Sequence, residues 1–388
     1  MKFLLIKAMA EAHPYSQFAM ALQGALRELG HLAVISDQSA HVSAGAATTE
    51  HLVRELQADA YDAVLSFSSF FGSIEMQDGR SFFDAIGVKF VGWQLDHPIY
   101  APQSLTRSLQ NRFAVYSNRH HLRYAEAVKL PGRGVILLPG GDLPSDEPRE
   151  HSARDWGVFI AATYRAEPVR TWEQAADSPG KRLMAGVVDR LLADREASLL
   201  DAFNETSAKL RLGARLGVDP DFDAQMRDFL CQPLTYVRNW DRIQSVRALV
   251  EAGLPVTICG GGWRQVFGHR DNLAYLEPVD FRDLPRLYGN ARVVINLNAG
   301  NGGSERAVHA ALAGAAVVSD FSRELDGLMG GGEGVAFFNR AKPETAVRVA
   351  AGLLEGDRGE ILARRGFERV AANGLWRHRA EQLAEFVA

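Results

Sequence analysis

ARVVINLNAGNGGSERAVHAALAGAAVVSD, residues 291–320, predicts a strand, a glycine-rich turn, a short helix and a second strand. The apolar and β-branched run at 293–297 is typical of a strand that is covered on both faces. Ser304 is a good N-cap for a helix over 305–313, and residues 315–319 return to the pattern of a strand. Together these elements form one βαβ unit, so the stretch predicts an open, parallel α/β sheet.

The turn of this unit is suited to holding a phosphate or a diphosphate. Its glycines let the backbone approach a ligand closely, and the first free N–H groups of a helix carry partial positive charge. The turn also lies at the carboxyl end of a strand, where open α/β sheets bind their ligands. The candidate donor-binding residues here are Asn298, Gly302, Gly303, Ser304, Glu305 and Arg306. The alternative is an ordinary βα turn that needs glycine for packing.

The bulk properties are those of a soluble globular protein. The 388 residues suffice for two domains, and the chain is 47% hydrophobic and 23% charged. A formal net charge of −4 gives no support for a nucleic-acid partner. Two cysteines, Cys231 and Cys259, argue against a disulfide framework, and no apolar run approaches the ~20 residues that span a bilayer. We therefore expect a cytoplasmic protein without a transmembrane segment.

Strand and helix patterns alternate along the first third of the chain, as in parallel βαβ units. Strands are expected at 2–6, 31–36, 63–67, 88–93, 113–117, 135–138 and 156–161, and helices at 15–29, 51–56 and 81–86. Residues 165–230 have helical spacing without strand-like runs, and the alternation returns with a helix at 241–252. The sequence thus predicts a Rossmann-like domain at 1–164, a helical insertion at 165–235, a second Rossmann-like domain at 236–374 and a C-terminal helix at 375–388.

Seven short motifs follow one another in a fixed order along the chain. They are a histidine-containing loop at 10–16, W-x-x-D-x-P at 93–98, L-P-G-G at 138–141, F-I-A-A-T-Y at 159–164, C-G-G-G-W at 259–263, Y-L-E-P-V-D-F-R-D-L-P-R-L-Y at 275–288 and S-E-R-x-x-x-A-x-x-A-G at 304–314. This series resembles GT-B glycosyltransferases, most closely the bacterial group around the spore-maturation CgeB-like proteins. The resemblance covers most of both halves and leaves residues 165–230 unmatched.

The resemblance implies a GT-B fold, in which two Rossmann-like, doubly wound domains face one another across a cleft. It also implies a nucleotide-sugar donor held mainly by the second half and an acceptor against the first. One departure is clear, because Asn301 and His309 stand where the retaining branch carries two glutamates spaced E-x7-E. His309 can still hydrogen-bond a ribose hydroxyl, or it is a histidine of the helix surface. Glu305 lies one helical turn before it, so both can face one ligand.

Inverting sugar transfer needs a general base that takes the proton of the acceptor hydroxyl. Three residues of the first half compete for this role. His13 lies in the loop after the first strand, where inverting GT-B enzymes often carry a catalytic histidine, and Asp96 and His97 follow the strand that ends at Trp93. A neighbouring carboxylate would raise the pKa of a histidine and orient its ring. The alternative for 96–98 is a turn in which Asp96 caps a helix and proline begins it.

Further donor contacts are expected in the second half. Gly261 and Gly262 allow close approach to a ligand, and Trp263 offers a ring that stacks on a base or a sugar, or else packs in the core. Arg306 is either a bidentate phosphate ligand or a solvated helix charge. The D-x-D pattern at 219–223 is better explained as the start of a helix, so we expect no metal site and no cofactor beyond the co-substrate.

These observations predict a glycosyltransferase that moves a sugar from a nucleotide diphosphate sugar, with UDP or dTDP as the nucleotide, to an unknown acceptor. Transfer is expected to be inverting and independent of metal, and the acceptor is a glycan, a lipid, a protein or a small molecule. An epimerase or hydrolase of sugar nucleotides on the same scaffold is one alternative. A nucleotide-sugar-binding protein without catalysis is another, and the oligomeric state stays open.

Overall fold

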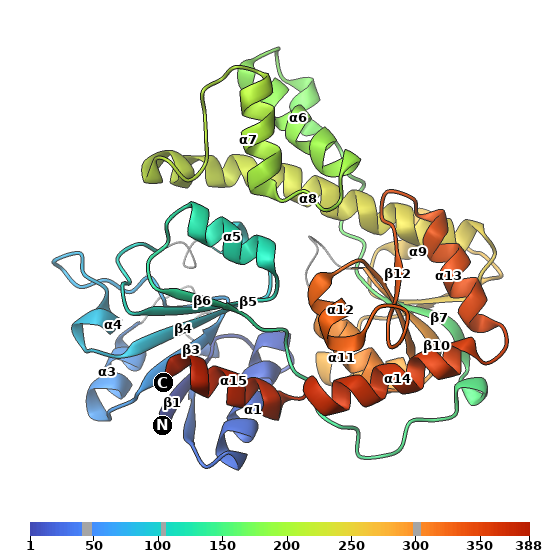
Figure 1. The fold of residues 1–388 in the computed structure, drawn as a ribbon, viewed down its shortest axis with the longest axis horizontal. Coiled ribbons are helices and arrows are strands. Elements are labelled where there is room, and N and C mark those ends of the chain that lie inside the picture. The colour runs from blue at the N-terminus through green and yellow to red at the C-terminus, as the bar shows by residue number, and fades with distance from the viewer. Residues whose placement is uncertain (41–48, 102–105, 298–303) are drawn as a thin grey trace. The chain divides into compact units, whose positions relative to one another are not determined.

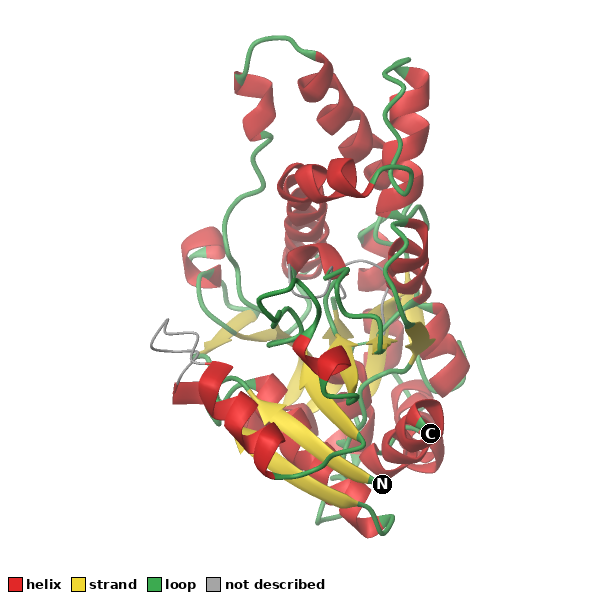
Figure 2. Cartoon of the chain, turned by 90° about the vertical axis from the view of Figure 1, so that its left-hand side faces the viewer, coloured by secondary structure: helices red, strands yellow, loops and turns green. Residues whose placement is uncertain are grey.

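The computed structural model describes residues 1–40, 49–101, 106–297 and 304–388. Their contacts divide the chain into two compact units (Figure 1). Unit 1 comprises residues 1–142, 280–282 and 374–388, and unit 2 comprises residues 143–279 and 283–373. Each unit contains one sheet of six described strands, flanked by helices (Figure 2). The predicted α/β class with two Rossmann-like sheets is confirmed.

Unit 1 is built on a parallel sheet with the strand order β2-β1-β3-β4-β5-β6. Its strands are β1 (Lys2–Lys7), β2 (Leu32–Asp37), β3 (Ala63–Phe67), β4 (Lys89–Gln94), β5 (Arg112–Tyr116) and β6 (Arg133–Ile136). Leu4 of β1 lies opposite Val34 of β2 and Val64 of β3. This order places a topological switch point between β1 and β3, and sheets of this kind bind ligands beside such a point.

The helices of unit 1 include the last helix of the chain. They are α1 (Pro14–Glu28), α3 (Thr49–Ala58), α4 (Phe82–Ala85), α5 (Arg119–Ala127), the short 3-10 helix η1 (Pro98–Tyr100) and α15 (Trp376–Val387). Figure 1 shows the red α15 beside the blue α1, against which it packs. Trp376 and Leu383 of α15 are buried in one core with Phe18 and Trp93. The C-terminal helix therefore completes the core of the N-terminal unit.

The L-P-G-G motif has a packing explanation in this arrangement. A Cβ atom on Gly140 would lie 2.7 Å from the Cα atom of Trp376, closer than such atoms approach in proteins. Gly141 N donates a hydrogen bond to Gly374 O, and Trp376 N donates one to Gly141 O, both at 3.0 Å. Glycine at 140 thus allows the chain to pair closely with the start of α15.

Unit 2 is built on a parallel sheet with the strand order β12-β11-β10-β7-β8-β9. Its strands are β7 (Trp156–Ala161), β8 (Val256–Cys259), β9 (Leu273–Leu276), β10 (Ala291–Asn296), β11 (Ala316–Asp320) and β12 (Ala336–Phe338). The predicted boundary at residue 164 differs from this structure, because β7 lies inside the second sheet. Val158 of β7 pairs with Val256 of β8 on one side and with Val293 of β10 on the other. An apolar strand pattern does not indicate which of two sheets the strand joins.

A helical segment stands between β7 and β8, as predicted. It contains η4 (Thr171–Gln174), α6 (Pro179–Ala193), α7 (Leu199–Lys209) and the 32-residue α8 (Pro220–Glu251). Asp219 caps α8 by accepting a hydrogen bond from Asp221 N at 2.9 Å, which confirms that the D-x-D pattern begins a helix. The helix expected at 241–252 is present as the last part of α8, which starts earlier and runs through Pro233 without a break.

The other helices of unit 2 cover the sheet. They are η3 (His151–Ala153), α9 (Trp263–Phe267), η5 (Phe281–Asp283), which straddles the boundary of the units, α10 (Leu284–Gly289), α11 (Glu305–Leu312), α12 (Arg323–Met329), α13 (Glu344–Leu354) and α14 (Arg358–Asn373). In the described part of the chain, no helix combines the length and the apolar character needed to cross a membrane.

Candidate functional site

Helix α11 begins at the carboxyl edge of the unit 2 sheet, and buried hydrogen bonds fix its first residues there. Ser304 Oγ accepts from Arg306 N at 3.2 Å, which confirms the predicted N-cap. The same hydroxyl donates to Asn296 Oδ1 at the end of β10 at 2.8 Å, and Asn296 Nδ2 donates to Ser319 Oγ in β11 at 3.0 Å. The N-terminus of α11 is thereby tied to two strand ends, and its free N–H groups can favour an anion.

Three of the predicted donor-binding residues lie outside the described residues. These are Asn298, Gly302 and Gly303, and Asn301 of the departure from E-x7-E lies outside them as well. Glu305 and His309 lie on α11 as expected, one turn apart and both half-buried. Their contact with a sugar or a ribose stays a prediction.

Arg306 connects strand ends within unit 2. Its Nη1 donates to Ala161 O at the end of β7 at 3.1 Å, and its Nη2 donates to Leu297 O after β10 at 3.3 Å. The side chain is 19% exposed and lies 3.8 Å from the carboxylate of Glu305. Arg306 is therefore not the solvated helix charge that one interpretation expected. A role in phosphate binding stays a prediction, with part of its donor capacity already used by the backbone.

The C-G-G-G-W motif packs against the segment that follows β7. Trp263 is fully buried, and its Nε1 donates to Ala162 O at 2.7 Å, so the core alternative is the one that the structure shows. A Cβ atom on Gly262, whose φ is 89°, would lie 2.7 Å from Tyr164 O. Gly261 alone of the two predicted glycines has open space around its Cα, so only this position leaves room for a ligand.

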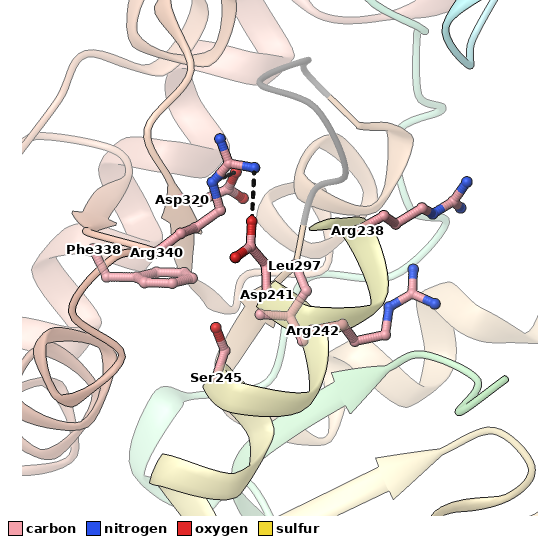
Figure 3. A pocket seen from close by; sticks show the side chains of 8 residues that line it. All are labelled: Arg238, Asp241, Arg242, Ser245, Leu297, Asp320, Phe338 and Arg340. Carbon is pink, nitrogen blue, oxygen red and sulfur yellow. Dashed lines mark hydrogen bonds and ion pairs between the residues drawn. The ribbon is translucent and has the colours of Figure 1, made fainter. Parts of the chain in front are cut away.

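A buried charge cluster at the carboxyl edge of unit 2 was not predicted from the sequence (Figure 3). Arg340, which follows β12, lies 3.2 Å from Asp320 Oδ2 at the end of β11 and 3.5 Å from Asp241 Oδ2 in α8. Arg195 lies 2.7 Å from Asp241 Oδ1. Burial raises the pKa of Asp241, and the cations of Arg340 and Arg195 oppose that shift. The cavity beside these groups, about 10 Å³, has room for roughly one water molecule.

This cluster ties the long helix of the insertion to the strand ends. Its members come from positions about 20 to 145 residues apart, so no local pattern predicts the cluster. Figure 3 shows Arg238 and Arg242 projecting from α8 away from Asp241. Arg242 Nη1 donates to Thr163 O after β7 at 3.1 Å, which adds a second tie between α8 and the same edge of the sheet. The edge is held rigidly before any ligand arrives.

In unit 1, the two candidate histidines cap helices in the same way. His13 Nδ1 accepts from Tyr15 N, and His97 Nδ1 accepts from Ile99 N, each at 3.2 Å and each followed by a proline. Burial lowers the pKa of His13, and burial with the nearby His120 lowers the pKa of His97 to about 3. A backbone N–H can only donate, so each neutral ring carries its proton on Nε2.

Asp96 is the third candidate for the base. It follows β4 and is exposed, and the hydroxyl of Tyr15 lies 3.5 Å from its Oδ2. The alternative in which Asp96 caps the helix at 98 is wrong, because His97 is the cap. Tyr15 packs edge-on against the ring of His13, with centroids 4.7 Å apart. The structure thus brings His13, Tyr15 and Asp96 together at the carboxyl ends of β1 and β4.

A strained turn beside this group was also not predicted. Ser68, Ser69 and Phe71, which follow β3, have positive φ of 56°, 54° and 67° although none is glycine. Each such residue costs about 1–3 kcal/mol, and strain of this kind gathers at functional sites. Ser69 Oγ accepts a hydrogen bond from Gln94 at the end of β4, and Gly92 leaves the space that Ser69 fills. Ser68 and Ser69 are buried, whereas Asp96 is exposed at the switch-point edge of unit 1.

Among the described residues, no three His, Cys, Asp or Glu side chains are grouped so that they could hold a metal ion.

Comparison with known proteins gives one family match and several structures of similar fold. Residues 238–385 match the sequence model of a family described as "Glycosyl transferase-like". This segment includes β8 to β12, α11 and the Asp241, Asp320 and Arg340 cluster. No protein of curated function matches the chain.

Solved structures resemble the whole chain. Sucrose-phosphate synthase from Thermosynechococcus elongatus matches with a TM-score of 0.57 and 11% identity over 99% of this chain and 98% of that one. Anabaena Alr3699/HepE in complex with UDP-glucose matches with a TM-score of 0.54 and 12% identity over 99% and 98%. An alpha-glucosyltransferase in complex with UDP and DNA matches with a TM-score of 0.54 and 9% identity over 100% and 99%. Identities this low establish the fold alone, and that fold is GT-B.

Proposed function

We propose that this chain is a glycosyltransferase that moves a sugar from a nucleotide diphosphate sugar to an acceptor hydroxyl. The observation that carries the proposal is the family match over 238–385, because it falls on the part of unit 2 that holds the α11 N-terminus at the sheet edge. UDP is the first nucleotide to test, since similar structures were solved with UDP or UDP-glucose, and dTDP is the second. The order of the sequence motifs favours the CgeB-like group within this fold.

The donor diphosphate would lie against the first N–H groups of α11. These groups carry partial positive charge, and Ser304 fixes their position through Asn296 and Ser319. Arg306 would act mainly by holding the ends of β7 and β10 in place. Catalysis without a metal is part of the proposal, because helix N–H groups and arginines can stabilise the departing diphosphate.

Inversion would use Asp96 as the base. The acceptor oxygen attacks the anomeric carbon, the bond from that carbon to the diphosphate oxygen breaks, and the acceptor proton passes to the carboxylate. His13 and His97 are poorer bases, since their Nδ1 lone pairs accept backbone N–H groups and their Nε2 atoms are protonated. The strained turn at Ser68 and Ser69 would help to position the acceptor.

The test combines donor binding with turnover. UDP and dTDP should each be tried for a rise in melting temperature, because a ligand bound only by the native state stabilises it. UDP release from a panel of UDP-sugars should follow, with and without EDTA. Asp96→Asn should lower turnover by about 100-fold or more while the UDP-induced shift persists. If neither nucleotide raises the melting temperature and no sugar nucleotide is turned over, the proposal fails.

One observation favours a second function, a nucleotide-sugar-binding protein without catalysis. The Nδ1 atoms of His13 and His97 each accept a backbone N–H at the start of a helix, which makes both residues poorer candidates for the base. A wild-type chain that binds UDP but releases none from any UDP-sugar, with a full panel of acceptors present, would support this alternative.

A further inference from the structure

The helical segment of unit 2 contains a second cavity, separate from the α11 edge. Its volume is about 350 Å³, within the range of roughly 300–1,000 Å³ in which proteins hold small molecules. One wall is the stretch 167–172, which follows β7 and leads into η4. The other wall is one face of α8, formed by residues between 231 and 239. None of the assigned candidate residues lines this cavity.

The floor of the cavity is a rigid aromatic cluster. Trp172 and Tyr236 are both nine-tenths buried and meet edge-on, with ring centroids 5.5 Å apart. Trp240 stacks on Tyr236 with centroids 6.1 Å apart, and the Arg170 guanidinium lies 5.4 Å from the Tyr236 ring. Arg170 is itself held by Asp189 at 2.7 Å. The apolar part of the site is therefore formed in advance and needs no rearrangement.

The lining also includes Pro168 and the exposed Val169, together with several polar side chains and, among the described residues, no lysine or arginine. Gln232 and Asn239 line the cavity from α8, and their side-chain amides make no hydrogen bond to other described residues. Thr171 and Thr235 add hydroxyl groups. The one charged lining residue is Glu167, which accepts a hydrogen bond from the Tyr164 hydroxyl at 3.3 Å. Amides and hydroxyls can both donate and accept, so these polar side chains suit a neutral ligand with many hydroxyl groups.

We propose that this cavity binds a neutral sugar ring, as a part of the acceptor remote from the hydroxyl that reacts. A pyranose has an apolar C–H face for the aromatic floor and a ring of hydroxyls for the amides and threonines. A nucleotide diphosphate does not fit, because no lysine or arginine lines the cavity and Glu167 would repel it. The role as an acceptor subsite rests on the proposed function, whereas binding of the sugar itself does not.

Cys231 provides a direct readout, because it lines the cavity whereas Cys259, the other cysteine, is buried elsewhere in unit 2. The native chain is treated with iodoacetamide, and mass spectrometry follows the alkylation rate at each cysteine. The probes are the methyl glycosides of glucose, galactose and mannose in both anomers, with maltose and cellobiose. We expect at least one probe to slow alkylation of Cys231 by a factor of 1 + [L]/Kd, roughly tenfold at ten times Kd, with Cys259 unchanged.

Two variants separate occupancy from indirect effects. Thr235→Trp fills the cavity, so protection of Cys231 by the glycoside should disappear. Asp228→Trp places the same bulk on α8 at a side chain that is 84% exposed and outside the cavity, so protection should remain. Thr235→Ala removes one hydroxyl without filling the cavity, so it should weaken protection without abolishing it, and this variant keeps the test decisive even if Thr235→Trp folds poorly.

The proposal is overturned if no probe protects Cys231 in the native chain, or if protection survives in Thr235→Trp. UDP serves as a further probe, and protection of Cys231 by UDP but by no glycoside would assign the cavity to the nucleotide. The UDP-induced melting shift, measured on the same samples, reports on the proposed function separately. Glycoside protection with no melting shift from UDP or dTDP and no turnover of a sugar nucleotide would preserve the sugar site while removing sugar transfer.

Discussion

Replacing Arg340 by methionine tests whether the buried charge cluster holds α8 to the strand ends of unit 2. The Arg340 side chain is 9% exposed, and those of Asp320 and Asp241 are 1% and 6% exposed. Removing one partner of a buried ion pair leaves an uncompensated charge and costs about 3–5 kcal/mol. Asp241 keeps Arg195 at 2.7 Å, so most of the loss should come from Asp320.

The loss of unfolding free energy can be measured by denaturant unfolding, followed by near-UV circular dichroism, and by calorimetry. For a unit of ~150–250 residues, each kcal/mol corresponds to roughly 2–4 °C, so the melting temperature of unit 2 should fall by about 6–20 °C. Arg182→Met is the matched control in the same unit. The pair of Arg182 and Asp177 is 50% and 69% exposed, so its loss should cost less than about 1 kcal/mol.

A second substitution shows whether the loss of stability comes from an uncompensated buried charge or from lost packing. Asp320→Asn in the Arg340→Met background removes the charge but keeps the size of the side chain, and it should restore part of the stability. The reasoning is refuted if Arg340→Met is no more destabilising than Arg182→Met. It is equally refuted if Asp320→Asn restores nothing, since the cost would then come from lost contacts.

Three further results are expected. The pKa of His97 is about 3 in the folded chain against 6.5 ordinarily, so the folded state stays unprotonated between these values and stability should fall as the pH drops from about 6.5 toward 3. His97→Asn keeps a capping side chain without the titration, and it should reduce this slope by up to about 1.4 kcal/mol per pH unit in acid unfolding curves. Gly140→Ala should destabilise unit 1 by about 1–3 kcal/mol in denaturant unfolding, because the new Cβ would meet the start of α15. Gly24→Ala, the control at an open helix position, should instead stabilise unit 1 by about 0.5–1 kcal/mol. Equal effects of the two substitutions would contradict the packing argument. His13→Asn should leave kcat within about threefold of the native value because asparagine also caps a helix, and a loss comparable to that of Asp96→Asn would return His13 to the list of bases.

Local chemistry accounts for what could be predicted from the sequence. The strand at β10, the Ser304 cap and the helix after it depend on neighbouring residues, and all three were predicted close to their observed bounds. The same holds for Asp219 at the start of α8. The fold class followed from the alternation of such elements, because parallel strands need crossover helices.

Contacts between distant residues account for what could not be predicted. The pairing of β7 with β10, the bond from Arg306 to Ala161 O and the ion pair of Arg340 with Asp241 each connect segments about 100 to 145 residues apart. Pro233 lies within α8, although proline usually breaks a helix. The capping bonds of His13 and His97 were not predicted, because the same residue types serve in catalysis and in helix starts.

The location of α15 in unit 1 has a consequence for biosynthesis. A ribosome releases β1 to β6 long before the residues around Trp376 and Leu383, yet those residues supply part of the first hydrophobic core. The N-terminal half should therefore remain sensitive to protease on stalled nascent chains until α15 has emerged, whereas unit 2 has all its strands by residue 338. In this protein the half that is translated first is the half that can finish folding last.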